Sequence, residues 1–324
     1  MVLGVLFLTD RKVLGRLELM NSPALLLTQQ PTKKPFVVTA SHDAVLQGVY
    51  KLHLATVEQL RVLLGYSKNS KERVQKLLKH LTDNGYLLAD CVPTKKGNSP
   101  YYYVLARKGR QYCEVLGLDI RHYFRPSQEK DLHSPFLTHT LSLNDVVISA
   151  HRLTHHAPEY SLSGFVHERV TKQSPYKTSV LLSDGTAQTI TVIPDAVFDF
   201  RKTQDKANER KNVVLYEHDM GTTEQKHFRR KIRAYLGFLK SGTYKELLGV
   251  KQIKVAFGTP MGDNRKAQMC DWTRKELAGT SEPKWLANVF FFAALPAELH
   301  PLEVWRNPLW YLPFDDTTGR SLLA

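Results

Sequence analysis

The chain has 324 residues and carries 45 Lys and Arg against 31 Asp and Glu, a formal net charge of +14 at pH 7. A chain of this length can bury two cores, so two domains are expected. The basic excess favours an anionic partner, above all nucleic acid. The three cysteines, Cys91, Cys113 and Cys270, are odd in number and lack the spacing of a zinc site. They argue against a disulfide framework and favour reduced thiols in the cytoplasm.

No membrane segment is expected. The apolar start, Met1–Leu8, is shorter than the roughly 20 residues that span a bilayer, and Asp10 and two basic residues follow at once. It also lacks the basic region and the cleavage site of a signal peptide. No later segment has an uninterrupted apolar run of spanning length. We therefore expect a cytoplasmic protein, in which residues 1–40 form an N-terminal extension.

Three helices are expected next. Ser41–Asp43 can cap a helix that ends near Leu54, and Thr56 can cap a second helix over residues 57–64. The third, Lys71–Leu81, is amphipathic. Its polar face carries the basic residues that a recognition helix uses to approach phosphates and base edges. These residues are Lys71, Arg73, Lys76 and Lys79.

Two strand-like runs, residues 86–88 and 101–105, follow the basic helix. They flank a turn that carries Lys95 and Lys96. Helix, helix, basic helix and a hairpin with a basic tip is the element order of a winged helix. The alternative is a generic helical subdomain with a solvated basic face. The pattern favours a winged-helix DNA-binding domain over residues 41–125, with Lys95 and Lys96 in the wing.

The rest of the chain, residues 126–324, is expected to be mixed α and β. A polar linker, Pro126–Asp131, precedes a long helix over Phe136–His156. The tail, Pro301–Pro313, is rich in aromatic residues, and we expect it to pack across its own domain. The expected strands cover 162–170, 179–182, 188–200, 212–219, 253–257 and 289–294, and the later helices cover 223–239 and 264–277.

Three acids lie near the ends of adjacent expected strands. Asp195 lies inside the 188–200 run, and Glu217 and Asp219 end the next strand, where alternation points both the same way. Met220 and Gly221 break that strand, and Thr222 or Thr223 can cap the helix that follows. Carboxylates that gather repel one another unless a cation, a proton or a basic partner is present.

The acids allow two interpretations. As hard oxygen ligands, Asp195, Glu217 and Asp219 suit Mg²⁺ or Mn²⁺. Alternatively, Asp195 caps a turn, while Glu217 and Asp219 form salt bridges with nearby Lys and Arg. Residue types alone leave both interpretations open.

The order helix, three strands, helix and strand resembles the PD-(D/E)XK fold, also called restriction-endonuclease-like. Pro194-Asp195 stands at the PD position, and Glu217-His218-Asp219 stands at the (D/E)XK position. Lys231 and Tyr235 are similar to the Q-x-x-x-Y helix motif of exonuclease-type members. The resemblance implies an α/β domain with Asp195, Glu217 and Asp219 at its catalytic centre.

A closer resemblance is to the replication-relaxation family of bacterial plasmids and integrative mobile elements. Its pattern is similar to PD…E-x-D-x-G-T-E…K-x-x-x-Y, and one extra Thr precedes Glu224 here. The resemblance covers roughly Ser41 to Pro313. It implies a winged helix joined to a nuclease-like domain, with DNA and replication, relaxase or transposition proteins as partners.

One position departs from an active nuclease. Asp219 occupies the place of the catalytic lysine, which normally positions water and offsets charge on the phosphate. Lys231, on the next helix, can act as a migrated lysine, with Glu224 and Tyr235 nearby. We therefore expect a DNA-binding accessory protein with a degenerate nuclease-like domain. The alternatives are a Mg²⁺-dependent endonuclease and a transcriptional regulator that uses only the winged helix.

Overall fold

The computed structural model describes residues 36–92, 100–122, 134–181, 186–202, 210–279 and 283–323. All the elements below belong to one compact unit, Val38–Ala324. Most of the expected extension, the linker Pro126–Asp131 and the wing residues Lys95 and Lys96 lie outside the described residues. No helix within the described ranges is long and apolar enough to cross a membrane. The three cysteines are free thiols, as predicted.

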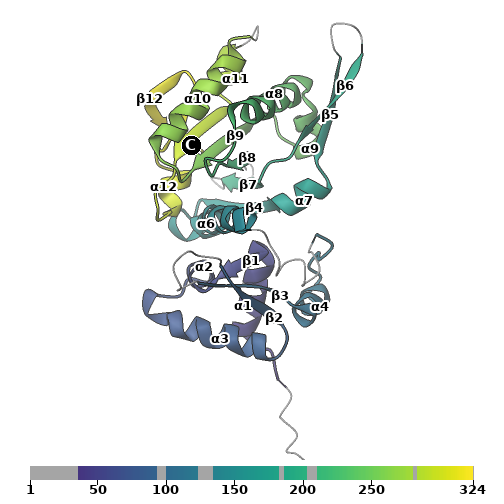
Figure 1. Cartoon of the computed structure of the whole chain (residues 1–324), viewed down its shortest axis with the longest axis vertical. Coiled ribbons are helices and arrows are strands. Elements are labelled where there is room, and N and C mark those ends of the chain that lie inside the picture. The colour runs from purple at the N-terminus through teal and green to yellow at the C-terminus, as the bar shows by residue number, and fades with distance from the viewer. Residues whose placement is uncertain are drawn as a thin grey trace, which may run out of the picture. The chain divides into compact units, whose positions relative to one another are not determined.

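The first group of elements is helical with a small sheet (Figure 1). Strand β1 pairs with β3, and β3 pairs with β2, all antiparallel. Capping boxes begin the first two helices, one between Thr39 and His42 and the other between Thr56 and Gln59. The first cap is therefore Thr39 and not Ser41–Asp43 as expected. The elements are α1 (Ala40–Leu52), β1 (Leu54–Thr56), α2 (Val57–Leu63), η1 (Lys68–Ser70), α3 (Lys71–Asp83), β2 (Leu87–Cys91), β3 (Tyr101–Leu105) and α4 (Arg107–Val115).

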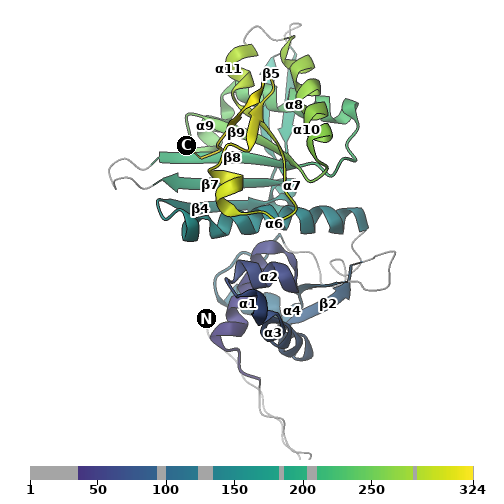
Figure 2. The same ribbon diagram turned by 90° about the vertical axis from the view of Figure 1, so that its left-hand side faces the viewer.

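The second group surrounds a seven-stranded mixed sheet with the order β12-β11-β10-β9-β8-β7-β4 (Figure 2). Strands β4, β7 and β8 are antiparallel neighbours, whereas β8, β9 and β10 run parallel. The strands of this sheet are β4 (Tyr160–His167), β7 (Ala196–Lys202), β8 (Arg210–His218), β9 (Ile253–Thr259), β10 (Phe290–Ala294), β11 (Trp310–Leu312) and β12 (Asp315–Arg320). The helices are α6 (Ser134–His156), α7 (Glu168–Gln173), α8 (Gln225–Ser241), α9 (Thr243–Leu248), α10 (Asp263–Leu277), α11 (Pro283–Ala287) and α12 (Pro301–Trp305). The expected mixture of α and β is confirmed.

Two expected strands are interrupted in the structure. Residues 188–200 were expected to form one strand, but Pro194 cannot donate to a ladder, and the run splits into β6 (Ala187–Val192) and β7. The 162–170 strand ends at His167, whose side chain accepts from the Arg169 backbone N–H and begins α7. Strand β6 pairs with β5 (Tyr176–Leu181) in a separate hairpin. That hairpin packs on α8, an arrangement that the alternation of residues did not indicate.

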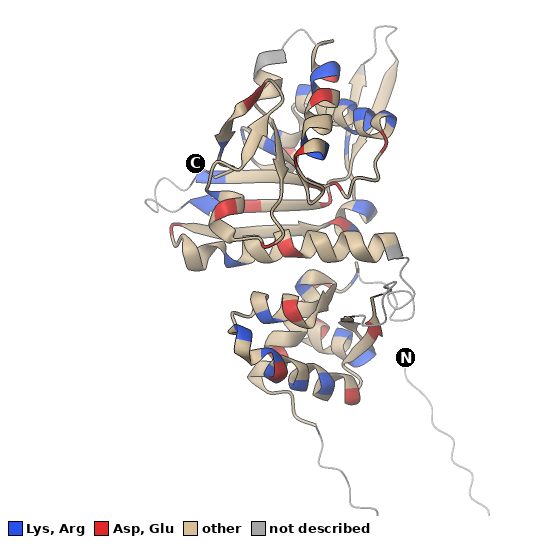
Figure 3. Cartoon of the chain, turned by 60° about the vertical axis from the view of Figure 1, so that its left-hand side comes forward, with Lys and Arg blue, Asp and Glu red and all other residues tan. Residues whose placement is uncertain are grey.

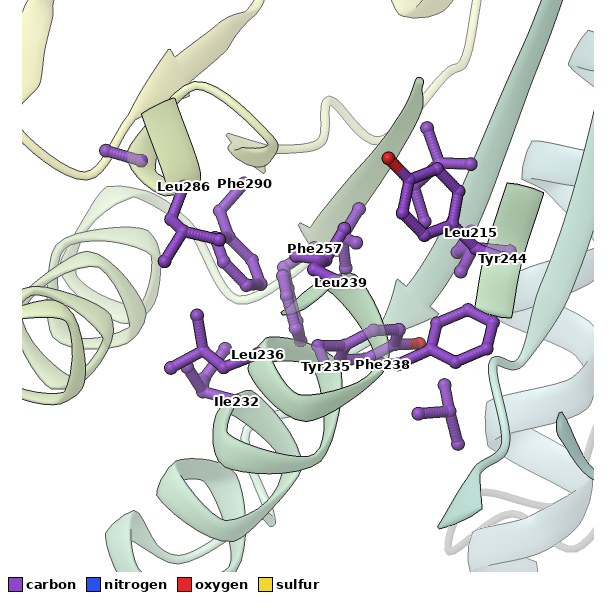
Figure 4. Packing of buried hydrophobic residues seen from close by; sticks show 14 of the residues in the cluster. Leu215, Ile232, Tyr235, Leu236, Phe238, Leu239, Tyr244, Phe257, Leu286 and Phe290 are labelled. Carbon is purple, nitrogen blue, oxygen red and sulfur yellow. The ribbon is translucent and has the colours of Figure 1, made fainter. Parts of the chain in front are cut away.

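The two faces of the large sheet are covered by different helices. Alternate residues of β8, such as Leu215, pack with α8 and α10 in the main apolar cluster, part of which Figure 4 shows around Ile232, Tyr235 and Phe257. The intervening residues, such as Tyr216, face the opposite side. There Trp305 is fully buried against Phe198, and its indole N–H donates to Ser149 of α6. The prediction that the aromatic tail packs within its own fold is confirmed.

Candidate functional site

The acids of the sequence pattern lie at the adjoining ends of β7 and β8. The register pairs Ala196 with Tyr216, so Asp195 just precedes that pair and Glu217 just follows it. Residues at opposed positions of antiparallel strands share a face, which brings these two carboxylates together. Asp219 lies beyond the end of β8, and all three side chains are buried. Burial of three carboxylates requires partners for their charge.

Glu217 is held by α8. Its Oε2 accepts from Lys231 Nζ at 2.5 Å, and its Oε1 accepts from Tyr235 Oη at 2.5 Å. Lys231 and Tyr235 are four residues apart and therefore lie on one face of the helix. Burial raises the pKa of Glu217 to about 7, because desolvation outweighs the attraction of Lys231. The prediction that Lys231 and Tyr235 face the acids is confirmed.

Asp195 is held by the backbone of β8 and by α6. Its Oδ2 accepts from the His218 backbone N–H at 2.7 Å, and His139 Nε2 lies 3.5 Å from the same oxygen. Burial opposes ionisation of this carboxyl, but His139 and the charge of Lys231 outweigh it and hold the pKa of Asp195 below its usual range. Burial lowers the pKa of His139, but Asp195 reverses this effect and the net shift is upward.

Asp219 is held by α10 through Arg265. The guanidinium donates from Nε to Oδ1 at 2.7 Å and from Nη2 to Oδ2 at 3.0 Å, a bidentate pair. The same Nη2 donates to the Thr223 carbonyl at 2.7 Å, and the guanidinium lies over the Trp272 ring. The Gly221 backbone N–H also donates to Asp219 Oδ1. The ion pair of Arg265 and Asp219 therefore holds the loop between β8 and α8 in place.

The loop geometry corrects one expectation. Helix α8 begins at Gln225, with Glu224 at the N-cap and no side-chain cap, and not at Thr222 or Thr223. Glu224 itself has an extended backbone, and the carbonyl of the preceding Thr223 accepts from Arg265. Glu224 is exposed and lies before the first turn of the helix.

Sequence reasoning missed three contributors to this cluster. Arg265 shares the buried face of α10 with Met269 and Thr273, and an arginine at a core position implies a buried acid. His139 of α6 lies far from Asp195 in the sequence, and no local pattern connects the two residues. His218 follows Glu217, so it faces the opposite side of the sheet. There its ring contacts Tyr216 Oη at 3.1 Å and Ser142 Oγ at 2.8 Å, and burial lowers its pKa to about 4.

The basic residues of the predicted recognition helix are exposed on α3. Val74, Leu78 and Leu81 form the buried side of that helix. Lys79 pairs with Asp83 at 2.7 Å, and the Arg73 guanidinium lies over the Tyr66 ring. The exposed basic side chains are Lys71, Arg73, Lys76 and Lys79. The predicted contacts of Lys95 and Lys96 lie outside the described residues.

Whether the three acids could hold a metal ion depends on which of their oxygens already accept hydrogen bonds from the protein. Protein groups already bind both Glu217 oxygens, both Asp219 oxygens and Asp195 Oδ2. Within the ranges that the structure describes, no three His, Cys, Asp or Glu residues gather in a way that could hold a metal ion. For Glu217 and Asp219, the structure has the salt bridges of the alternative interpretation. The Mg²⁺ or Mn²⁺ site stays a prediction.

We expect Arg265→Ala to destabilise the protein by about 3–5 kcal/mol, since it leaves a buried, unpaired carboxylate at Asp219. Urea unfolding followed by circular dichroism measures this change. The matched control is Lys275→Ala, which removes an exposed pair with Asp271 on the same helix and should change stability little. Equal effects of the two substitutions would contradict the assignment of Arg265.

Comparisons with known proteins identify a family. Neither a curated protein nor a solved structure matches the chain. One family model, described as replication-relaxation, matches residues 46–278, which is more than two thirds of the 324 residues. The matched stretch contains α3, Asp195, Glu217, Asp219, Lys231 and Arg265. The chain therefore belongs to the replication-relaxation family.

Proposed function

We propose that this protein is a DNA-binding accessory factor in the replication, transfer or transposition control of a mobile genetic element. Membership of the replication-relaxation family supports a role in replication. The observation that carries DNA binding is α3, whose buried apolar side leaves four basic side chains exposed. Such a helix can approach phosphates and the base edges of the major groove.

The elements around α3 support a winged-helix domain. The chain order is α1, β1, α2, α3, β2 and β3, and the sheet order is β1-β3-β2. Helix α3 packs against α1 and α2, which leaves its basic side free to enter a groove. The hairpin of β2 and β3 follows α3, as a wing follows a recognition helix. The tip of that hairpin carries Lys95 and Lys96 in the sequence.

The second group of elements supports a nuclease-like domain. Helix α6 precedes the antiparallel strands β4, β7 and β8, and α8 then crosses over to β9, which runs parallel to β8. Asp195 and Glu217 lie at the strand ends where the resemblance places the acids. We propose that this domain is a non-catalytic clamp or partner platform. Asp219, in the lysine's place, is committed to Arg265, and this supports the proposal.

One observation favours a second candidate, a metal-dependent endonuclease. Lys231 contacts Glu217 and is attracted by Asp195, so two acids and a lysine share one site. The Lys231 side chain is 41% exposed, so it can leave Glu217 without a change in α8. Asp195 and Glu217 would then hold the metal, which would supply charge for the attack of water on a phosphate.

We expect Lys76→Glu with Lys79→Glu to weaken DNA binding at least tenfold, since both side chains are exposed on the polar side of α3. The slope of log K against log salt should become shallower by about 2, one unit for each lost phosphate contact. Fluorescence anisotropy of a labelled duplex at several salt concentrations measures both effects. The matched control is Lys245→Glu with Lys251→Glu, which reverses two exposed charges away from α3. If the α3 variant binds as tightly as the control, α3 does not contact DNA.

A nicking assay separates the two candidate functions. We expect the wild-type protein to bind supercoiled plasmid and to leave it intact with either Mg²⁺ or Mn²⁺. The Asp195→Ala variant, tested in parallel, controls for a contaminating nuclease. Cleavage by the wild type that disappears in this variant would establish the endonuclease and exclude the clamp.

A further inference from the structure

Helix α8 has a one-sided charge. Its 17 residues, Gln225–Ser241, include six Lys and Arg and not a single Asp or Glu. Figure 3 shows the basic residues of the chain in blue and the acidic residues in red. Helix α3, the predicted recognition helix, is less basic, since Glu72 and Asp83 offset part of its charge. The α8 charge lies in the second group of elements, beside the acid cluster. The six residues are Lys226, Arg229, Arg230, Lys231, Arg233 and Lys240.

Ion pairs with acidic residues account for only part of this positive charge. Lys231 points inward and pairs with Glu217. Arg229 pairs with Glu276 of α10, and Arg233 Nη1 lies 3.6 Å from the same carboxylate. Lys226, Arg230 and Lys240 are exposed, and no acidic partner is found for them among the described residues.

Three of the exposed basic residues form a stripe along the helix. Lys226, Arg230 and Arg233 follow the spacing i, i+4 and i+7, which places them on one side of α8. At 1.5 Å per residue, these three span about 10 Å. The opposite side of the helix, with Phe228, Ile232 and Tyr235, is buried. The stripe therefore faces solvent, on the side of α8 opposite the residues that contact the sheet.

This arrangement costs the isolated helix stability. Like charges at i and i+4, as in Lys226 with Arg230 and Arg229 with Arg233, repel by a few tenths of a kcal/mol per pair. Lys226 also lies in the first turn, where the helix dipole disfavours a cation. A solvated face usually mixes both signs of charge, and α8 does not. A bound polyanion would offset these repulsions.

We propose that Lys226, Arg230 and Arg233 form a second contact surface for the DNA phosphate backbone, separate from α3. The proposal rests on the proposed DNA-binding function and adds a place for the nucleic acid on the second group of elements. Backbone contacts of this kind add affinity and salt dependence but carry no sequence information. The stripe would hold a DNA strand against α8, the helix that also carries Lys231.

The test neutralises the two stripe residues that have no acidic partner. Lys226→Gln with Arg230→Gln keeps good helix formers at exposed positions, and the loss of repulsion should leave the melting temperature equal to or above that of the wild type. The control is Lys245→Gln with Lys251→Gln. Binding of a labelled duplex and of a labelled single strand is measured against salt, alongside the Lys76→Glu, Lys79→Glu variant.

We expect the stripe variant to bind at least one of the two DNA forms several-fold more weakly than the control. Its salt slope should be shallower by about 1–2, from up to two lost phosphate contacts. The form that is affected shows whether α8 contacts duplex or single-stranded DNA. If the stripe variant matches the control on both forms while the α3 variant loses binding, the stripe is a solvated face and the proposed function stands. If both variants bind as the wild type does, both proposals fail.

Discussion

Three carboxylates buried at the ends of β7 and β8 constrain the second group of elements. A buried, unpaired carboxylate costs several kcal/mol, so each acid requires a donor from a neighbouring element. Glu217 takes its donors from α8, Asp219 from α10, and Asp195 from β8 and α6. Because three acids engage three helices, the cluster fixes α6, α8 and α10 around one end of the sheet.

The pairing of these acids affects which chemistry the domain can perform. A metal-dependent nuclease needs carboxylate oxygens that are free to bind a cation and a lysine that is free to meet water and phosphate. Here Lys231 pairs with Glu217, and Asp219 pairs with Arg265. Of the two cations, Lys231 is partly exposed, whereas the Arg265 side chain is nearly buried.

Local signals in the sequence predicted much of the fold. Some features depend only on residues close in the sequence and can be predicted from it. These are the Thr56 cap of α2, the amphipathic pattern of α3 and the four-residue spacing of Lys231 and Tyr235. The acids at the strand ends were also identified. What the sequence could not show was which partner each acid takes. Arg265 is 46 positions from Asp219, and no local pattern connects them. The separate hairpin of β5 and β6 was missed for the same reason, since its place on α8 depends on contacts distant in the sequence.

We propose that Lys231 supplies the counter-charge that Asp195 and Glu217 need, so that the folded protein does not depend on a metal. Thermal unfolding in EDTA and in millimolar Mn²⁺ tests this for the wild type and for Lys231→Met, with Lys226→Met as an exposed control on the same helix. We expect one melting temperature for the wild type under both conditions. We expect a lower value for Lys231→Met in EDTA that Mn²⁺ partly restores, because Asp195 and Glu217 have then lost the charge of Lys231. Equal stabilisation of the wild type and the Lys231 variant by Mn²⁺ would show that Lys231 is not the counter-charge of these acids.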